Sequence, residues 1–86
     1  MTKIVPHLSL SKLDDETVLL DSKTGRYYSL NPTAARMLEI LAETGNPEAV
    51  VPRMKAEYDT DALRLHRDWE ALFREFLDRG FLVQAD

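Results

Sequence analysis

Side chains capable of acid–base or metal chemistry are few and scattered in this sequence. His7 and His66 stand far apart, and neither belongs to a two-histidine metal spacing such as H-E-x-x-H. Asp14, Asp15 and Glu16 are adjacent, but they lack the alternating oxygen ligands and glycine of a calcium loop, so we interpret them as a solvated turn. The chain has no cysteine, which excludes disulfides, thiolate metal sites and thiol nucleophiles. The sequence therefore predicts no catalytic residue, no metal and no cofactor.

The side chains suited to recognition are aromatic and cationic. Tyr27 and Tyr28 are neighbours in a β-type run, and only one can face inward because side chains alternate along a strand. The other phenol must line the outside or the edge of the sheet, where it offers apolar area and a hydrogen-bonding tip. Farther along, Arg64, Arg67 and Arg74 alternate with acidic residues on the polar side of a predicted helix. They form either a mutually screened surface or a wall that faces an acidic ligand.

The tyrosine pair lies in the last of three short β-type runs. We predict strands at residues 5–10, 17–21 and 26–30, with Pro6 restricting the first strand to a sheet edge. Gly25 supplies the positive φ that a hairpin loop between the second and third strands often requires.

Three helices should follow the strands. Asn31 is a capping residue before a proline, which predicts a helix start, and Gly45 predicts its end. The same Asn-Pro signal begins a second helix over residues 46–58, and a third helix spans residues 61–79. Trp69, Phe73 and Phe76 follow the inner stripe of this third helix, so we interpret them as core. Residues 81–83 could form a final strand or an extended tail over the core.

The predicted fold class is α+β, with an N-terminal three-stranded antiparallel sheet followed by three helices. This is the layout of a winged helix-turn-helix variant. At 86 residues, with 44% hydrophobic and 30% charged residues, we expect one globular domain over residues 1–86. The N-terminal segment lacks the apolar core of a signal peptide, and no apolar run approaches the roughly 20 residues of a membrane span. We therefore expect a cytoplasmic protein with no membrane partner.

A hairpin whose last strand turns directly into a helix leaves a sheet edge free beside a helical surface. Such an edge accepts an extended peptide as an added strand, with side-chain pockets giving specificity. We expect the third strand to be this edge and the third helix to be the opposite wall of the groove, where Leu65, Trp69 or Leu72 would contact an inserted side chain. The predicted peptide-binding residues are Arg26, Tyr27, Tyr28, Ser29, Leu30, Leu63, His66, Arg67, Trp69, Glu70 and Arg74.

The segment LLDSKTGRYYSLNPTAARMLEIL resembles the central signature of the PqqD-like family. These are RiPP recognition elements, which bind leader peptides of ribosomally made, post-translationally modified peptides. The matching positions are residues 18–20, Gly25, Tyr27, Tyr28, Leu30, Asn31, Ala34, Ala35 and Leu38. The Asp-x-x-x-Gly-x-Tyr-Tyr form is most similar to the stand-alone proteins of lasso-peptide gene clusters.

The resemblance implies a non-catalytic adaptor. Such a protein holds the leader region of a precursor peptide as an added strand against the third strand and third helix. It delivers the precursor to a separate leader peptidase, after which a cyclase closes the macrolactam. Lasso leaders of this type commonly carry a Tyr-x-x-Pro motif, so the groove is expected to accept an aromatic ring and a proline.

Two other classes of protein stay open at this point. A winged-helix DNA-binding regulator is favoured by the helical arrangement and by the arginines of the third helix. It is opposed by the formal net charge of −4, with 15 acidic against 11 basic residues, because nucleic-acid affinity comes largely from Lys and Arg. A small enzyme would be indicated by activity on an isolated precursor without a partner.

Overall fold

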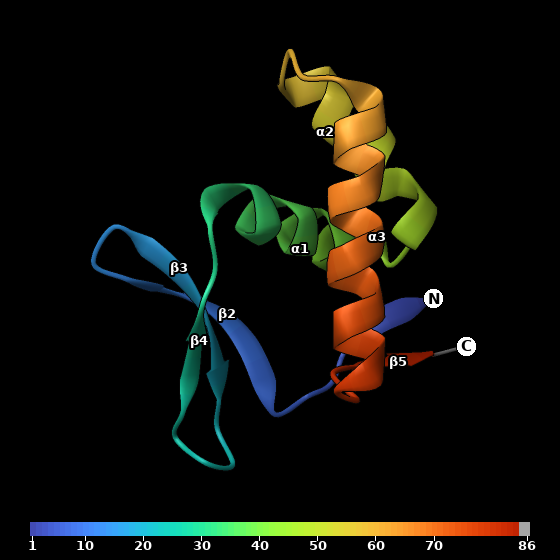
Figure 1. Ribbon diagram of the computed structural model, residues 1–86. Coiled ribbons are helices and arrows are strands. Elements are labelled where there is room, and N and C mark those ends of the chain that lie inside the picture. The colour runs from blue at the N-terminus through green and yellow to red at the C-terminus, as the bar shows by residue number, and fades with distance from the viewer. Residues whose placement is uncertain (85–86) are drawn as a thin grey trace.

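The computed structural model describes residues 1–84 and shows a mixed α+β arrangement (Figure 1). Its elements are β1 (Thr2–Ile4), β2 (Leu8–Leu13), β3 (Glu16–Asp21), β4 (Tyr27–Ser29), α1 (Pro32–Thr44), the 3₁₀ turn η1 (Pro47–Ala49), α2 (Val50–Glu57), α3 (Ala62–Asp78) and β5 (Leu82–Gln84). The predicted α+β class, with an antiparallel sheet followed by three helices, is confirmed. No helix in the described residues has the length and apolar content to cross a membrane.

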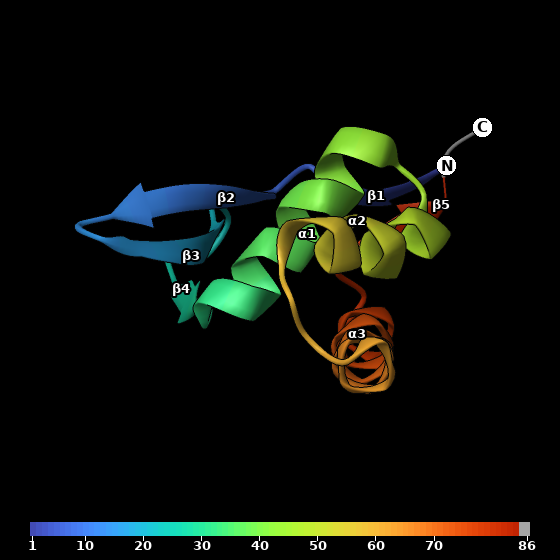
Figure 2. The ribbon, with the colours of Figure 1, turned by 90° about the horizontal axis from the view of Figure 1, so that it is seen from above.

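The strands form two separate antiparallel sheets. One sheet has the order β2-β3-β4, and the other pairs β1 with β5. Figures 1 and 2 place the β1–β5 pair beside the base of α3, apart from the larger sheet. The expected final strand therefore exists, and its partner is the first strand of the chain.

The first strand of the larger sheet begins later than predicted. The sequence indicated residues 5–10, whereas β2 spans Leu8–Leu13 and residues 2–4 form a strand of their own. Pro6 and His7 occupy a turn in which the N–H of Leu8 donates to the carbonyl oxygen of Val5 at 3.1 Å. Proline has no N–H to donate to a ladder, so the chain breaks its pairing there.

Helix α1 lies at the centre of the molecule, between the larger sheet and the other two helices (Figure 2). Its N-terminus is capped as predicted, because the Asn31 side chain accepts a hydrogen bond from the N–H of Ala34 at 2.8 Å. The side chains of Ile40 and Leu41 are fully buried. The other core residues that are no more than 1% exposed are Leu19, Met37, Leu38, Val50 and Met54.

The second predicted helix is divided into η1 and α2. Pro52 cannot donate the backbone hydrogen bond that a continuous α-helix from Pro47 would direct at the carbonyl of Glu48. The Asn46 side chain caps the resulting 3₁₀ turn by accepting from the N–H of Glu48 at 3.0 Å. Regular α-helix starts at Val50, which leaves Pro52 in its first turn.

Helix α3 ends in a hydrogen-bonded turn that places Phe81 against the larger sheet before the chain enters β5. Gly80 has a left-handed φ of 72°. The N–H of Phe81 donates to the carbonyl of Phe76 at 2.9 Å, and the N–H of Gly80 donates to that of Leu77 at 3.1 Å. These two bonds and the edge-to-face contact between Phe76 and Phe81, with ring centroids 5.4 Å apart, define a Schellman motif. The motif brings Phe81 within 5.7 Å of the Tyr28 ring, measured between centroids.

Candidate functional site

Strand β4 is an open edge of the larger sheet. It pairs with β3 on one side, and no strand in residues 1–84 pairs with its other side. The C-terminal strand β5 would close this edge if it lay against β4, but it pairs with β1, with Ile4 opposite Leu82. The edge therefore stays available for a further strand.

Backbone hydrogen bonds at both ends of β4 fix its phase relative to β3. The N–H of Leu30 donates to the carbonyl of Thr17 at 3.3 Å, and the N–H of Asp21 donates to the carbonyl of Arg26 at 2.8 Å. Hydrogen-bonded and non-hydrogen-bonded pairs alternate along an antiparallel ladder. Residues 26, 28 and 30 consequently direct their backbone polar groups at β3.

Tyr27 and Ser29 direct their backbone groups away from the sheet. They lie opposite Leu20 and Val18, between the hydrogen-bonded positions. The open edge thus presents two N–H donors and two carbonyl acceptors at the spacing of a β-ladder. An extended chain of either direction can pair with them.

A hollow of about 400 Å³ lies between β4 and the C-terminal half of α3. Its base is aromatic, formed by Tyr28, Phe76 and Phe81. Its full lining is Leu19, Tyr27, Tyr28, Ser29, Leu30, Leu72, Glu75, Phe76, Arg79 and Phe81.

A second hollow of about 380 Å³ continues along α3 toward the start of α1. It shares Leu72 and Glu75 with the first hollow and adds Arg64 and Asp68 from α3. The start of α1 contributes Asn31, Thr33, Ala34 and Met37. We call the two hollows together the β4–α3 groove.

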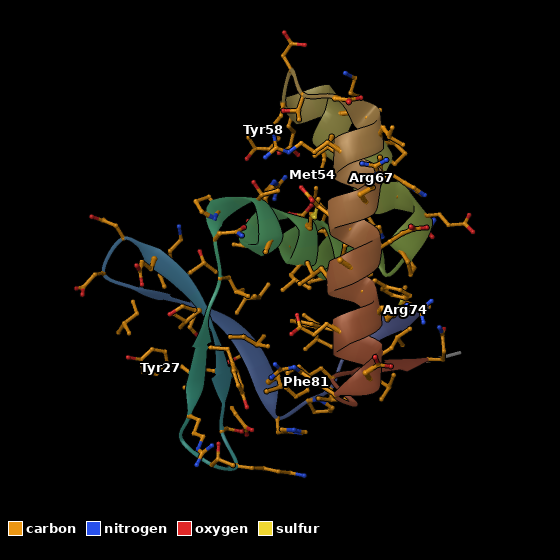
Figure 3. All side chains as sticks on the ribbon, viewed as in Figure 1. Tyr27, Met54, Tyr58, Arg67, Arg74 and Phe81 are labelled. Carbon is orange, nitrogen blue, oxygen red and sulfur yellow. The ribbon has the colours of Figure 1, made fainter. Side chains whose placement is uncertain are left out.

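The two tyrosines of β4 differ in their environment, as strand alternation predicts. Tyr28 is half-buried in contact with Phe81, whereas Tyr27 is 56% exposed on the other face of the sheet. Figure 3 shows Tyr27 on the side of β4 that points away from Phe81. Tyr28 therefore belongs both to the groove and to the packing of the Schellman turn.

The hairpin that holds β4 depends on the Asp21 side chain. Its carboxylate accepts hydrogen bonds from the N–H of Lys23 at 2.9 Å and from that of Thr24 at 3.4 Å. Burial acts to raise the pKa of Asp21, but these two N–H groups and the charge of His7 together outweigh it. They hold the pKa of this carboxyl below its ordinary value. Gly25, with φ of 76°, completes the loop as predicted.

The structure brings together the predicted strand residues but not the predicted helix residues. The groove is lined by Tyr27, Tyr28, Ser29 and Leu30. Arg26 lies immediately before the start of β4. The α3 residues that line the groove are Arg64, Asp68, Ala71, Leu72, Glu75, Phe76 and Arg79. Of the predicted helix contacts, only Leu72 is among them.

The predicted residues of α3 lie on two other sides of the helix. His66, Trp69 and Glu70 line a hollow that faces the α1–α2 connection. Arg67 and Arg74 line another hollow with Glu70, and Figure 3 places Arg74 on the side of α3 that faces away from β4. Leu63, near the start of the helix, is 58% exposed and lines none of these hollows.

The orientation of α3 is fixed by Trp69. Its indole N–H donates to the carbonyl oxygen of Pro47 at 3.1 Å, and the residue is only 6% exposed. The interpretation of Trp69 and Phe76 as core is confirmed, and Phe73 is half-buried against the same core. Because Trp69 packs toward the α1–α2 connection, the groove is left to the residues flanking Leu72, at positions 64, 68, 75 and 79. These positions lie eight and four residues before Leu72 and three and seven residues after it, which is the spacing of one helix face and a signal that the sequence carries.

The groove combines several features that are suited to binding. Among residues 1–84, no group of three or more His, Asp or Glu side chains is placed to hold a metal ion. What the groove does offer is unpaired main chain, an aromatic base and a charged rim.

Comparison with known proteins identifies the family of the chain. Residues 16–82 match the protein family described as coenzyme PQQ synthesis protein D, PqqD. The chain belongs to the PqqD family. The resemblance found in residues 19–41 is thereby confirmed over most of the chain. None of the curated proteins compared with this chain matches it significantly.

Two solved structures are similar to this protein over almost the whole chain. TbiB1 in complex with the TbiA(beta) leader peptide is 33% identical, with a TM-score of 0.78 and coverage of 98% of this chain and 99% of that one. A lasso peptide synthetase B1 complexed with the leader peptide is 29% identical, also with a TM-score of 0.78, and covers 96% and 98%. This protein thus shares the fold of two proteins that were solved in complex with leader peptides.

Proposed function

We propose that this protein binds the leader of a ribosomal precursor peptide as an added strand on β4. The observation that carries the proposal is the open edge of β4 beside an aromatic groove. The leader-bound relatives support it, since both are similar over almost their whole length. Lasso-peptide biosynthesis is the pathway that these relatives indicate.

In the proposed complex, the leader pairs with the outward backbone groups of Tyr27 and Ser29. Alternate side chains of the leader then face the groove and bury apolar area against Tyr28, Leu72 and Phe81. Backbone pairing supplies affinity that tolerates sequence variation, and the groove supplies specificity. An aromatic ring and a proline, as in a Tyr-x-x-Pro leader, suit the aromatic base.

The proposed role is that of a non-catalytic adaptor. The groove holds the leader in extended form, and a separate leader peptidase and a cyclase perform the bond-breaking and bond-forming steps. We assign the helical contacts of the leader to Leu72, Glu75, Phe76 and Arg79. Arg67 and Arg74 face elsewhere, so we assign them no contact with a peptide in the groove.

Peptide selection combined with amide NMR tests the proposal. The protein is used to select from a library of random extended peptides, and the TbiA(beta) leader is titrated in parallel. We expect a common motif among the selected peptides, and the amides of Tyr27 and Ser29 become protected from exchange when such a peptide binds. Failure to enrich any peptide, or protection confined to another surface, would contradict the proposal. Salt-sensitive binding of duplex DNA without peptide binding would favour the DNA-binding regulator.

A further inference from the structure

Two arginine residues lie in or next to one end of the β4–α3 groove. Arg79 lines the groove at the end of α3. Arg26 immediately precedes β4, and side-chain alternation puts it on the same face as Tyr28. This end of the groove therefore carries two cationic side chains, in a molecule whose formal net charge is −4.

Arg79 lies over the aromatic base of the groove. The central carbon of its guanidinium is 5.8 Å from the ring centroids of both Tyr28 and Phe81. The Nη2 atom of Arg79 donates to Oε1 of Glu75 at 3.2 Å. Stacking on two rings and pairing with Glu75 hold the guanidinium at the mouth of the groove.

Most of the hydrogen-bonding capacity of Arg79 is unused. A guanidinium carries five N–H donors in a fixed fork. Within residues 1–84, Glu75 is the one side chain that accepts from it. The Arg26 guanidinium forms no ion pair with a residue of this range. Glu75 pairs with Arg79. The nearby Asp21 carboxylate accepts from the N–H groups of Lys23 and Thr24 and forms no ion pair with Arg26, so the Arg26 charge is unpaired within residues 1–84.

A guest strand on β4 would bring its own side chains to these groups. Guest residues that lie opposite Tyr28 and opposite Arg26 project from the same face of the sheet as those two residues. That face is the one on which Arg79 stacks. A carboxylate at either guest position can therefore accept from the free arm of Arg79, in the charge-assisted geometry that guanidinium groups favour.

We propose that Arg79, assisted by Arg26, makes this end of the groove select an acidic side chain in the bound peptide. The acidic residue is the guest position that faces the groove at the Arg26 end of β4. This inference rests on the proposed function and adds a determinant of specificity to it. Pairing with the guest carboxylate would leave the stacking of Arg79 on Tyr28 and Phe81 in place.

Selection from a random library of extended peptides tests the role of Arg79. The library is applied to the wild-type protein, to Arg79→Gln, to Arg79→Glu and to Arg79→Lys. Arg74→Gln is the matched control, since it removes the same charge from the same helix but outside the groove. We expect the wild type, Arg79→Lys and Arg74→Gln to enrich Asp or Glu at one groove-facing position. Arg79→Gln should lose this preference, and Arg79→Glu should replace it with Lys or Arg.

Titration with single peptides measures how strongly the acidic residue is preferred. A selected peptide and its version with Gln in place of the acidic residue should differ about fivefold in affinity for the wild type, the upper range for an exposed ion pair. They should bind Arg79→Gln equally. Thermal melting of each variant checks that the fold persists. Identical residue preferences in the wild type and in folded Arg79→Glu would overturn this inference alone. If the wild type enriches no peptide at all, the proposed function is overturned as well.

Discussion

At the scale of single residues, the proposed site depends on backbone groups rather than on reactive side chains. The hydrogen-bond phase of β4 singles out the N–H groups of Tyr27 and Ser29 as the outward donors. The side chain of Ser29 is exposed, so its backbone can be altered with little effect on the core. Substitutions at Ser29 can therefore test backbone pairing independently of side-chain contacts.

Ser29→Pro should weaken peptide binding by about fivefold, because it removes one outward N–H worth about 1 kcal/mol. The residue before a proline favours extended backbone, which Tyr28 already has, so the sheet should persist. Fluorescence anisotropy with a selected peptide measures the loss.

Ser29→Ala is the matched control, since it removes the hydroxyl and keeps the N–H. Its affinity should equal that of the wild type. If Ser29→Pro folds and also binds as the wild type does, the register of the added strand is wrong.

At the scale of elements, the turn after α3 sets the end of the groove. The Schellman bonds at Gly80 and Phe81 position both Arg79 and Phe81 beside β4. The hairpin loop between β3 and β4 positions β4 in the same way. Each of these turns can be perturbed by one substitution.

Gly80→Ala should destabilise the protein by about 1 kcal/mol, because a left-handed φ is unfavourable for a residue with a Cβ. The added Cβ meets no atom within 4 Å, so the cost is conformational and not steric. Urea denaturation measures it. Gly80→Asn should lose less, since asparagine tolerates this conformation. An equal loss in both variants would point to a cause other than φ.

Acid should weaken the β3–β4 hairpin through Asp21. Its folded-state pKa lies below the ordinary value, so ionised Asp21 stabilises the fold above the unfolded-state pKa. That stabilisation is lost as the pH falls through the folded-state pKa. Asp21→Asn keeps an acceptor oxygen for the two N–H groups and does not titrate. The wild type should therefore lose more stability than Asp21→Asn between about pH 7 and about pH 3 in urea denaturation. Equal losses would exclude the proposed role of the Asp21 charge.

The elements themselves were largely predictable, and their mutual arrangement was less so. Asn31, Gly45 and Gly25 are local signals, and each acts at the predicted position. The β1–β5 pair joins the two ends of the chain, a contact for which no local pattern exists. The rotation of α3 depends on where Trp69 finds its acceptor, which is Pro47 in another part of the chain. Sequence periodicity identified the buried stripe of α3 but not which flank would face β4.

At the scale of the whole molecule, ligand binding and folding are linked. The groove is formed by β4, α3 and the start of α1, which are distant in sequence and meet only in the folded state. A peptide that binds this surface stabilises the fold by mass action.

A selected peptide at about 100 times its dissociation constant should add about 2.7 kcal/mol to the free energy of unfolding. For a domain of this size, that corresponds to a rise in melting temperature of roughly 10 to 20 °C. Differential scanning fluorimetry measures the rise. Ser29→Pro at the same peptide concentration should show a smaller shift. A saturating peptide that leaves the melting temperature unchanged would mean that it does not bind the native fold.

The pairing of β1 with β5 makes the molecule a candidate for circular permutation. Thr2 lies opposite Gln84, and Figures 1 and 2 place β1 and β5 away from β4. A short linker could join these strands, and new termini could be opened at the exposed hairpin of Asp14 and Asp15 without cutting any element that lines the groove.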